Sequence, residues 1–454
     1  MTSKIKFAQS RINCFLNGKI PTIEDIVEDT VIINEAKNKS IKIEVDDEYI
    51  INSKGRLTLL NPKCPIHRDR HITENGWTSN QLETITGDKI KIIRQMNICS
   101  KCKIVLLPSL EFLKVPYGRI TKNGQRYLLE LTIEDGLTLR KAKRRLKNTF
   151  GLEISVDRIW NLIQSTGMKC NEKMDDIDVD FSGVAAYDED ILLKTAKNVA
   201  KLTIIDAVNG YAIKEEVREN KKSDTIKSFL KDGLKNKDLF AIVTDCDLNY
   251  PDIIKFNFPG ILHQLCVSHF NGIIEGDLRK AAGLNYSKKK ILPEKYQKIK
   301  GKIHHILSSK NRLIAEKRLY SLFQSDFGDN MEIDSILIKI REYFFNLTHF
   351  MEDCRIPKTN NMLESRYSTM EPNYRNNRRF KTLEGANNYS NCQTLFRNFY
   401  VIEEGTYVNS SPYSRAGLNH KDDDWLNIIG FGNKLKNYIM KVEKAIFKEI
   451  RVNT

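Results

Sequence analysis

Three carboxylate residues, far apart in the chain, stand in contexts that suit metal binding. Asp188 ends the apolar run 183–187 and Asp245 ends the apolar run 239–244, so both are expected at strand ends. Glu364 lies just inside an expected helix start. Two strand-end carboxylates and one helical carboxylate can hold a pair of hard divalent cations, Mg²⁺ or Mn²⁺. This arrangement cuts and rejoins phosphodiester bonds without a covalent intermediate.

The strands that carry the two aspartates must be neighbours for this site to form. Neighbouring strands lie about 4.8 Å apart, so Asp188 and Asp245 would share one metal, and two ions would lie roughly 3.5–4 Å apart. Glu364 would complete the site from a helix packed on the sheet. For any single aspartate at a strand end, the common alternative is a turn residue. Asp206 is assigned to that class because the hairpin dipeptide Asn209-Gly210 follows it. Two further acidic residues are candidates for supporting the ligands: Glu189 and Asp247.

Two pairs of cysteine and histidine residues predict a structural zinc site. Cys64 and His67 form the first pair, and Cys99 and Cys102 form the second after a strand-rich stretch. Each short loop can place two ligands on one side of an ion, and tetrahedral closure needs the second loop, as in a zinc ribbon. The alternative is chance clustering of cysteines in a reduced protein. His71 is a candidate substitute for His67.

Residues 116–176 have the pattern of a helix-turn-helix unit. Helices are expected at 125–135 and at 139–150, the second capped by Thr138, and a third is expected after the cap residue Ser155. The second helix is strongly basic, and the third would present polar side chains to the major groove of DNA. The candidate DNA contacts are Arg140, Lys143, Arg144, Arg158, Asn161 and Gln164. The alternative is a solvated, basic three-helix bundle.

After residue 180 the pattern changes to strands. A meander of three strands, then a helix, then further parallel strands fits a ribonuclease H-like sheet. Helical, Lys-rich residues 275–354 then interrupt this core. The expected strands are 183–187, 199–206, 211–217, 239–244 and 260–266, and the expected helix is 223–234.

Short polar motifs lie at the ends of the expected core elements. Cys266 and His269 form a Cys-x-x-His pair after the last strand. This pair either binds a metal ion or consists of a buried cysteine and a hydrogen-bonded histidine, and both alternatives stay open. Asn360 and Asn361 are expected to cap or orient the helix of Glu364.

Taken in order, these pieces resemble the catalytic core of DDE transposases with a ribonuclease H-like fold, and most of all the Mutator-like branch with its prokaryotic insertion-sequence transposases. The resemblance extends over residues 181–397. It is carried by Tyr187-Asp188-Glu189, Thr244-Asp245 with Tyr250-Pro251, His263 to His269, and Thr359 to Glu364. It implies that the three carboxylates are catalytic and that the Cys-x-x-His pair lies in the core beside them. It also implies a helical insertion before the glutamate.

The length of 454 residues exceeds what one core holds, so we expect a multidomain α/β protein. The expected fold class combines zinc-ribbon and helix-turn-helix modules with a ribonuclease H-like catalytic domain that contains an α-helical insertion. The expected boundaries are 1–55, without assigned function; 56–115, the zinc-ribbon-like module; 116–176, the helix-turn-helix domain; 177–274 and 355–400, the two parts of the core; 275–354, the insertion; and 401–454, a C-terminal helical region.

The composition favours a nucleic-acid partner. A formal net charge of +15 favours polyanions, although a generally basic proteome is the alternative. A basic run that includes Arg378 and Arg379 is expected to hold DNA phosphates, or else is a solvated surface. The sequence has no apolar run of about 18 residues and no apolar signal core, and nine cysteines then favour a reducing compartment. We therefore expect a cytoplasmic protein with no membrane partner, associated with the nucleoid of a prokaryote.

These expectations converge on a transposase. It would bind the terminal repeats of a mobile DNA element, hydrolyse DNA at the element ends with two Mg²⁺ or Mn²⁺ ions, and join the freed 3′-hydroxyl to target DNA. A structural Zn²⁺ would support the N-terminal module. The partner is double-stranded DNA, and joining two ends calls for a homo-oligomer, at least a dimer on DNA. The alternatives are a ribonuclease H-like nuclease not engaged in transposition and a transposase-derived DNA-binding regulator.

Overall fold

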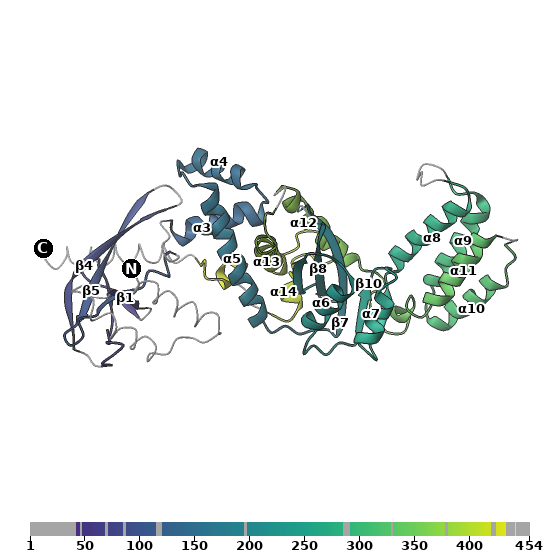
Figure 1. The fold of residues 1–454 in the computed structure, drawn as a ribbon, viewed down its shortest axis with the longest axis horizontal. Coiled ribbons are helices and arrows are strands. Elements are labelled where there is room, and N and C mark those ends of the chain that lie inside the picture. The colour runs from purple at the N-terminus through teal and green to yellow at the C-terminus, as the bar shows by residue number, and fades with distance from the viewer. Residues whose placement is uncertain are drawn as a thin grey trace. The chain divides into compact units, whose positions relative to one another are not determined.

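The chain forms two compact units (Figure 1). The first comprises Met1–Tyr127, Leu146–Leu152 and Gly430–Thr454, and the second comprises Leu128–Arg145 and Glu153–Ile429. The computed structural model describes residues 42–45, 48–68, 71–84, 88–114, 120–194, 198–284, 291–327, 330–376, 380–418, 424–432 and 441.

The first unit contains a six-stranded sheet; Cys99 ends one of its strands, and Cys64, His67 and Cys102 lie in loops between strands. The strand order is β1-β6-β5-β3-β2, with β4 also paired to β5. The strands are β1 (Lys42–Val45), β2 (Tyr49–Ile51), β3 (Leu57–Leu59), β4 (Ile72–Glu83), β5 (Lys89–Cys99) and β6 (Val105–Pro108). Because β1 and β2 precede residue 56, this sheet begins before the module boundary expected there. Its core contains Leu57, Leu82, Ile92, Leu110 and Leu113.

The three helices of the expected helix-turn-helix segment are present. They are α3 (Lys122–Leu129), which continues into the π-helix η1 (Glu130–Glu134), α4 (Leu139–Phe150) and α5 (Val156–Asp176). Both predicted caps are confirmed. The Lys141 backbone N–H donates to Thr138 Oγ1 at 3.3 Å, and the Arg158 backbone N–H donates to Ser155 Oγ at 3.2 Å. The first helix begins at Lys122, three residues before its predicted start.

The second unit contains a five-stranded sheet with the order β11-β10-β7-β8-β9. Strands β7, β8 and β9 form an antiparallel meander, while β10 is parallel to β7 and β11 is parallel to β10. All five predicted strands are therefore present, and all but one have the predicted ends within a few residues. They are β7 (Val184–Lys194), β8 (Asn198–Asp206), β9 (Ala212–Arg218), β10 (Ala241–Thr244) and β11 (Leu262–Leu265).

One strand end was predicted wrongly. Strand β7 does not end at Tyr187 but continues past Asp188 to Lys194. The cause is the neighbouring strand β8, which goes on pairing with it, Asp188 opposite Thr203 and Glu189 opposite Leu202. On its other side β7 loses its partner earlier, because β10 ends at Thr244. Asp188 thus lies beyond the end of β10 while it still pairs with β8.

Helices cover both faces of this sheet. Side chains alternate between the faces along each strand, so Ala185 and Tyr187 pack with α6 (Ser223–Gly233) and α7 (Tyr250–Asn257). Val184 and Ala186 pack on the opposite face, where α12 (Asn361–Asn376) contributes Leu363 and Tyr367.

The edge strand β9 is covered by α13 (Leu383–Phe399) rather than by another strand. The side-chain amide of Asn387 accepts from the Val217 N–H and donates to its carbonyl, at 2.7 and 3.0 Å. The side-chain amide of Asn398 likewise accepts from the Ala212 N–H at 2.9 Å and donates to the Ala212 carbonyl at 3.1 Å. These amides satisfy backbone groups that would otherwise remain open at the edge of the sheet.

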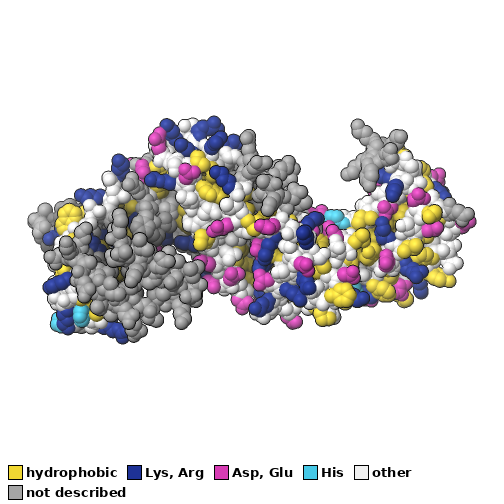
Figure 2. Space-filling view, in the orientation of Figure 1, with side chains coloured by type: hydrophobic (Ala, Val, Ile, Leu, Met, Phe, Trp, Pro, Cys, Tyr) yellow, Lys and Arg dark blue, Asp and Glu magenta, His cyan; other side chains and the backbone are white. Residues whose placement is uncertain are grey.

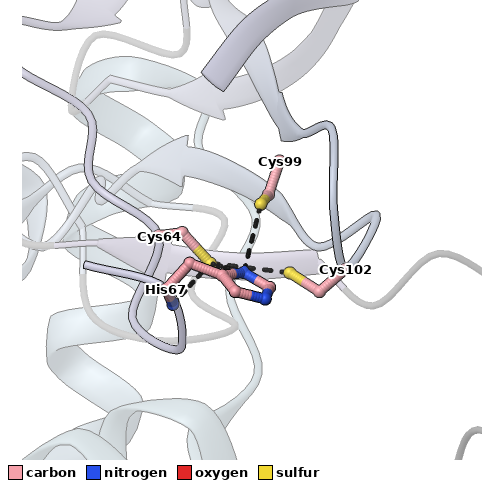
Figure 3. Close-up of side chains that lie close together, drawn as sticks. All are labelled: Cys64, His67, Cys99 and Cys102. Carbon is pink, nitrogen blue, oxygen red and sulfur yellow. Dashed lines mark hydrogen bonds between the residues drawn. The ribbon is translucent and has the colours of Figure 1, made fainter. Parts of the chain in front are cut away.

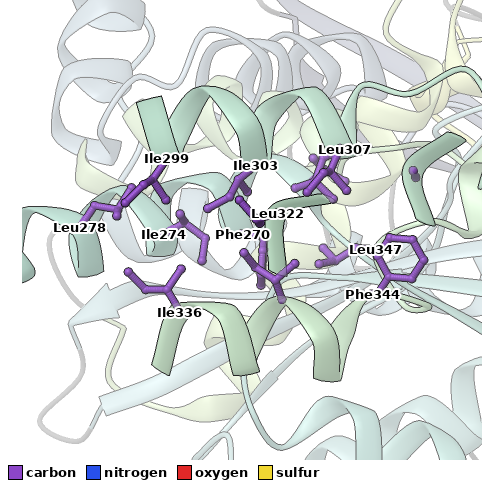
Figure 4. Packing of buried hydrophobic residues seen from close by; sticks show 14 of the residues in the cluster. Phe270, Ile274, Leu278, Ile299, Ile303, Leu307, Leu322, Ile336, Phe344 and Leu347 are labelled. Atoms are coloured by element: carbon purple, nitrogen blue, oxygen red, sulfur yellow. The ribbon is translucent and has the colours of Figure 1, made fainter. Parts of the chain in front are cut away.

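The helical insertion is a bundle with its own core. It comprises α8 (Val267–Ala281), α9 (Glu294–Leu307), α10 (Arg312–Phe323) and α11 (Met331–Tyr343). The helical character predicted for residues 275–354 is thus confirmed. Phe270, Ile274, Ile303, Leu322 and Ile336 meet in the bundle centre (Figure 4). The first helix starts at Val267, directly after β11 and before the expected boundary at 275.

The C-terminal part described here contains two short helices, α14 (Pro412–Arg415) and α15 (Trp425–Ile428). The last part of the helical region expected at 401–454 lies outside the described residues, apart from a single position at 441. Within the described part of the chain, no helix has both the length and the apolar character needed to span a membrane.

Candidate functional site

Strand register brings Asp188 and Asp245 to the same place on the sheet. Val243 on β10 pairs with Ala186 on β7. Asp245 follows Val243 by two residues, and Asp188 follows Ala186 by two residues. Because side chains alternate, both aspartates project from the face that α12 covers. Each carboxylate also accepts a local backbone N–H: Glu189 donates to Asp188 Oδ1 at 2.8 Å, and Asp247 donates to Asp245 Oδ1 at 2.9 Å.

The two aspartates are strained electrostatically. Burial, together with the charge of Asp245, raises the pKa of Asp188 to about 7. Burial also raises the pKa of Asp245, while the Asp247 N–H and His269 act in the opposite direction. Two desolvated carboxylates with mutual repulsion favour a shared cation, and an all-oxygen donor set suits Mg²⁺ or Mn²⁺. The residues therefore fit such ions.

Helix α12 brings Glu364 to the same face, and its first turn is attached to β7. Asn360, just before the helix, donates its backbone N–H to Cys266 Sγ at 3.3 Å and its side-chain amide to the Tyr187 carbonyl at 3.1 Å. One turn further on, the Tyr367 hydroxyl donates to the Asp188 carbonyl at 3.0 Å. The helix start is therefore bonded to β7 on both sides of the Asp188 Cα. Asn361 is exposed as the first residue of the helix.

The Cys-x-x-His pair lies beside Glu364. His269 Nδ1 is 3.6 Å from Glu364 Oε1, and the ligand atoms of Cys266, His269 and Glu364 all lie within 4.8 Å of one another. The sulfur of Cys266 raises the pKa of His269 to about 9 against the effect of burial, and Glu364 and Asp245 add to the rise. A metal ion on this pair would thus take Glu364 as its third ligand.

The remaining acidic candidates have separate roles. Glu189 projects to the opposite face, where it accepts from the Tyr250 hydroxyl and contacts Lys221 Nζ at 3.3 Å. Its side chain is therefore turned away from the two aspartates, and its support of Asp188 is limited to the backbone N–H. Asp247 supports Asp245 through its backbone N–H. Asp206 is buried in its turn, where it accepts from the N–H groups of Val208 and Asn209.

The four predicted zinc ligands converge in the first unit (Figure 3). Cys64 Sγ lies 3.5 Å from Cys102 Sγ and 3.4 Å from His67 Nδ1, and Cys99 Sγ lies 3.5 Å from the same nitrogen. A tetrahedron of ligands about 2.3 Å from zinc has edges of about 3.8 Å, so this spacing suits the ion. His71 is not part of the cluster.

The electrostatics of the cluster also suit a cation. Burial raises the pKa of Cys99, but hydrogen bonds from the Cys102 and Lys101 backbone N–H groups and from the Cys102 and Cys64 side chains together bring it down to about 6. The same N–H groups would stabilise a thiolate that binds a metal.

The basic candidates are exposed on α4. Lys and Arg side chains gather over this helix (Figure 2), and Arg140, Lys143 and Arg144 are all exposed. On α5, Arg158 and Asn161 are exposed as well. Arg378 and Arg379 lie outside the described residues.

Gln164 does not face outward as expected. Its side-chain amide donates to the Gly385 carbonyl at 3.2 Å and accepts from Asn388 Nδ2 at 3.0 Å. Helix α13 occupies this face of α5, and the two helices approach so closely that a Cβ on Gly167 would lie 2.0 Å from the Asn388 carbonyl oxygen. Gln164 therefore serves helix packing and is not oriented for a DNA contact.

Sequence patterns alone missed two features of the site. One is Tyr367, whose hydroxyl bonds to the Asp188 backbone. The other is a buried group of charges formed by Lys201, Glu215 and Arg366. A lysine within the apolar run of β8 was the available signal for the second, since an unpaired lysine is rarely buried in a strand.

Comparison with known proteins gives one match to report. The chain is similar to the insertion element ISM1 uncharacterized 48.3 kDa protein of Methanobrevibacter smithii. The two are 21% identical over 385 residues, which cover 82% of this chain and 90% of the other. No protein-family model matches the chain. This similarity identifies a relative from a mobile element.

Proposed function

We propose that this protein is a DDE-type transposase of the Mutator-like branch, with a ribonuclease H-like catalytic core. The observation that carries the proposal is the convergence of Asp188 and Asp245 on the sheet face covered by the helix of Glu364. The strand order β11-β10-β7-β8-β9, with its meander and two parallel strands, supports the ribonuclease H-like assignment. Similarity to a protein of an insertion element supports the mobile-element context.

In this proposal Asp188, Asp245 and Glu364 hold two Mg²⁺ or Mn²⁺ ions. When bound, such ions lower the pKa of an attacking hydroxyl or water and stabilise the leaving oxygen. The chain's own residues set the geometry: β7 and β10 fix the two aspartates by their register, and Asn360 and Tyr367 hold α12 against β7.

The reaction has two phosphoryl-transfer steps. In the first, water attacks the phosphorus at an element end, the bond from phosphorus to the 3′-oxygen breaks, and the element keeps a 3′-hydroxyl. In the second, that 3′-oxygen attacks a phosphorus of the target strand, and the target's own 3′-oxygen leaves. Both steps need DNA held close to the carboxylates, which the exposed cations of α4 favour by neutralising phosphates.

The proposed partners follow from the same layout. The zinc-type cluster and the helices α3 to α5 would bind the terminal repeats, with a structural Zn²⁺ on Cys64, His67, Cys99 and Cys102. Because two element ends must be joined to one target, we propose that at least two copies act together on DNA.

A joining assay tests this function. Purified protein is incubated with Mg²⁺, a supercoiled target and linear DNA that ends in the sequences flanking its own gene. We expect products in which the 3′ ends of the linear DNA are bonded to target 5′ phosphates. Cutting without joining, on any duplex or on RNA–DNA hybrids, would instead indicate a nuclease. End binding with neither reaction would indicate a regulator.

A further inference from the structure

A group of three charged side chains lies buried between the sheet and α12. Lys201 on β8 and Glu215 on β9 have fully buried side chains, and the Arg366 side chain on α12 is 7% exposed. Lys201 Nζ lies 2.7 Å from Glu215 Oε2, and Arg366 Nε lies 2.6 Å from Glu215 Oε1. Each carboxylate oxygen of Glu215 therefore faces one cation.

Glu215 lies in the same row of the sheet as Asp188. Asp188 pairs with Thr203 across β7 and β8, and Thr203 pairs with Glu215 across β8 and β9. Two strand spacings separate Asp188 and Glu215, or about 10 Å. Helix α12 crosses this row, with the Tyr367 hydroxyl on the backbone of Asp188 and Arg366 on Glu215.

The remaining polar atoms of the group bind α13. Arg366 donates through Nη1 to Asn398 Oδ1 at 3.4 Å and through Nη2 to the Thr394 carbonyl at 3.3 Å. The Thr394 hydroxyl donates to Glu215 Oε2. Asn398 in turn bonds both backbone groups of Ala212 on β9. The charges thus connect α12 to β9 directly and through α13.

Such a group is an inefficient way to stabilise a core. Burial would raise the pKa of Glu215, but Arg366 and Lys201 lower it to about 2, so the carboxylate is ionised. Well-packed apolar residues often replace buried ion pairs without loss of stability. Directional bonds, unlike the apolar contacts of Leu363, oppose rotation of a helix about its axis.

We propose that Arg366, Glu215 and Lys201 are positioning residues that fix the rotation of α12 and so place the carboxylate of Glu364 opposite Asp188 and Asp245. The inference rests on the proposed function, in which these carboxylates hold divalent cations. Two residues of an α-helix span about 200°, so an arginine bonded to β9 holds the glutamate on the other side of the helix.

The required accuracy explains why rotation matters. Side chains reach about 5–6 Å from a helix axis, so a rotation of about 20° moves the tip of Glu364 by about 2 Å. Metal–ligand distances tolerate only about 0.2 Å. A helix held by apolar contacts alone would leave the third ligand out of place for part of the time.

Direct Mn²⁺ binding, followed by electron paramagnetic resonance on the zinc-loaded full chain, tests the inference without relying on activity. The variant is Arg366→Lys, which keeps the charge and loses the fork of donors. We expect Mn²⁺ affinity to fall about tenfold, the lower end of what changing a group that supports a metal ligand costs. Hydrogen exchange in α12 should rise, with zinc content unchanged.

Two control variants separate positioning from general stability. Lys214→Gln removes a cation from β9, the strand of Glu215. The Lys214 side chain bonds to Asp232 of α6 on the other face of the sheet. Ile303→Ala destabilises the core of the helical insertion. Both should retain wild-type Mn²⁺ affinity. If Arg366→Lys does not fold, the double change Lys201→Met with Glu215→Gln, which removes one cation and one anion together, carries the same expectation.

The outcome for Asp188→Asn tells two failures apart. If Asp188→Asn loses Mn²⁺ affinity while Arg366→Lys binds Mn²⁺ as tightly as the wild type does, the positioning role is wrong and the proposed function stands. An equal loss in Arg366→Lys and Ile303→Ala would also overturn the positioning role. If Asp188→Asn keeps wild-type affinity, the metal site itself is wrong.

Discussion

At the residue scale, the aspartates proposed to bind metal ions differ from an aspartate that stabilises a turn. Asp188 and Asp245 face each other across neighbouring strands with raised pKa values, whereas Asp206 has its carboxylate occupied by backbone N–H groups. All three end apolar runs in the sequence, and sequence position alone does not distinguish them. The hairpin dipeptide after Asp206 does, because it predicts a turn that uses the carboxylate.

Asp206 supplies the first prediction. Asp206→Ala removes an acceptor from several buried or half-buried donors, including the Ser182 N–H at 2.7 Å and the Ser182 hydroxyl at 2.9 Å. We expect a loss of about 1–3 kcal/mol in unfolding free energy for each donor left unpaired, with Mn²⁺ affinity retained. Urea unfolding and Mn²⁺ titration measure the two effects. Loss of Mn²⁺ affinity in a folded Asp206→Ala protein would contradict the assignment.

His263 gives a prediction on pH. Burial lowers its pKa to about 3, and its Nε2 lies 2.9 Å from the Thr244 hydroxyl. In the unfolded chain this histidine takes up a proton below about pH 6.5, while the folded protein resists it until about pH 3. Stability is therefore lost as the pH falls between these values, by up to ~1.4 kcal/mol per pH unit, and is unaffected above them.

His263→Gln removes this titration. We expect the variant to be less stable than the wild type at pH 7 and the difference to shrink toward pH 4, as measured by urea unfolding. The exposed His304→Gln is the matched control and should follow the wild type. A constant difference between His263→Gln and the wild type across this pH range would show that His263 is not held neutral.

At the scale of the elements, the sequence predicted the strands and helices of the core well, because apolar runs bounded by turn residues are local signals. It failed where a partner element decides the outcome. Strand β7 extends past Asp188 because β8 continues to pair with it. Gln164 bonds to Asn388 of α13, which lies more than two hundred residues away in sequence. The cysteine ligands were found because their spacing carries the information locally.

The cluster of Cys64, His67, Cys99 and Cys102 supplies a prediction for β4 and β5. Cys99 ends β5, so its loss should release the end of the hairpin. We expect Cys99→Ser to lose bound zinc and to speed hydrogen exchange in β4 and β5, while exchange in the second unit stays unchanged. Cys354→Ser, an exposed cysteine outside the cluster, should change neither. Full zinc content in the Cys99→Ser protein would contradict a four-ligand site.

Helices α4 and α5 should contribute differently to DNA binding. Arg158→Ala on α5 should weaken binding to the element end more than to random DNA, by about 1–3 kcal/mol for a base contact. Lys143→Gln on α4 should weaken both alike and reduce the salt dependence. Fluorescence anisotropy at several salt concentrations measures both. An equal loss for the two variants on both DNAs would mean that α5 does not contact bases.

At the scale of the whole molecule, a chain with a net charge of +15 gathers acidic side chains at the proposed metal site and exposes basic ones on helices. The proposed chemistry requires both, since the carboxylates bind cations and the cations of α4 bind phosphates. Fold class and the three carboxylates could be proposed from sequence because each motif is short. Their arrangement around α12 could not, because it depends on long-range contacts such as Arg366 with Glu215.

The most direct test of the central claim is the cleavage of element-end DNA by three single variants, Asp188→Ala, Asp245→Ala and Glu364→Ala. Each removes a ligand and leaves the attacking and leaving oxygens without full stabilisation, so each should abolish Mg²⁺- or Mn²⁺-dependent strand cleavage while end binding remains nearly intact. Asp224→Ala, an exposed aspartate in the first turn of α6, is the control and should cleave normally. Cleavage at the wild-type rate by any of the three variants would remove that residue from the site, and cleavage by all three would contradict the account.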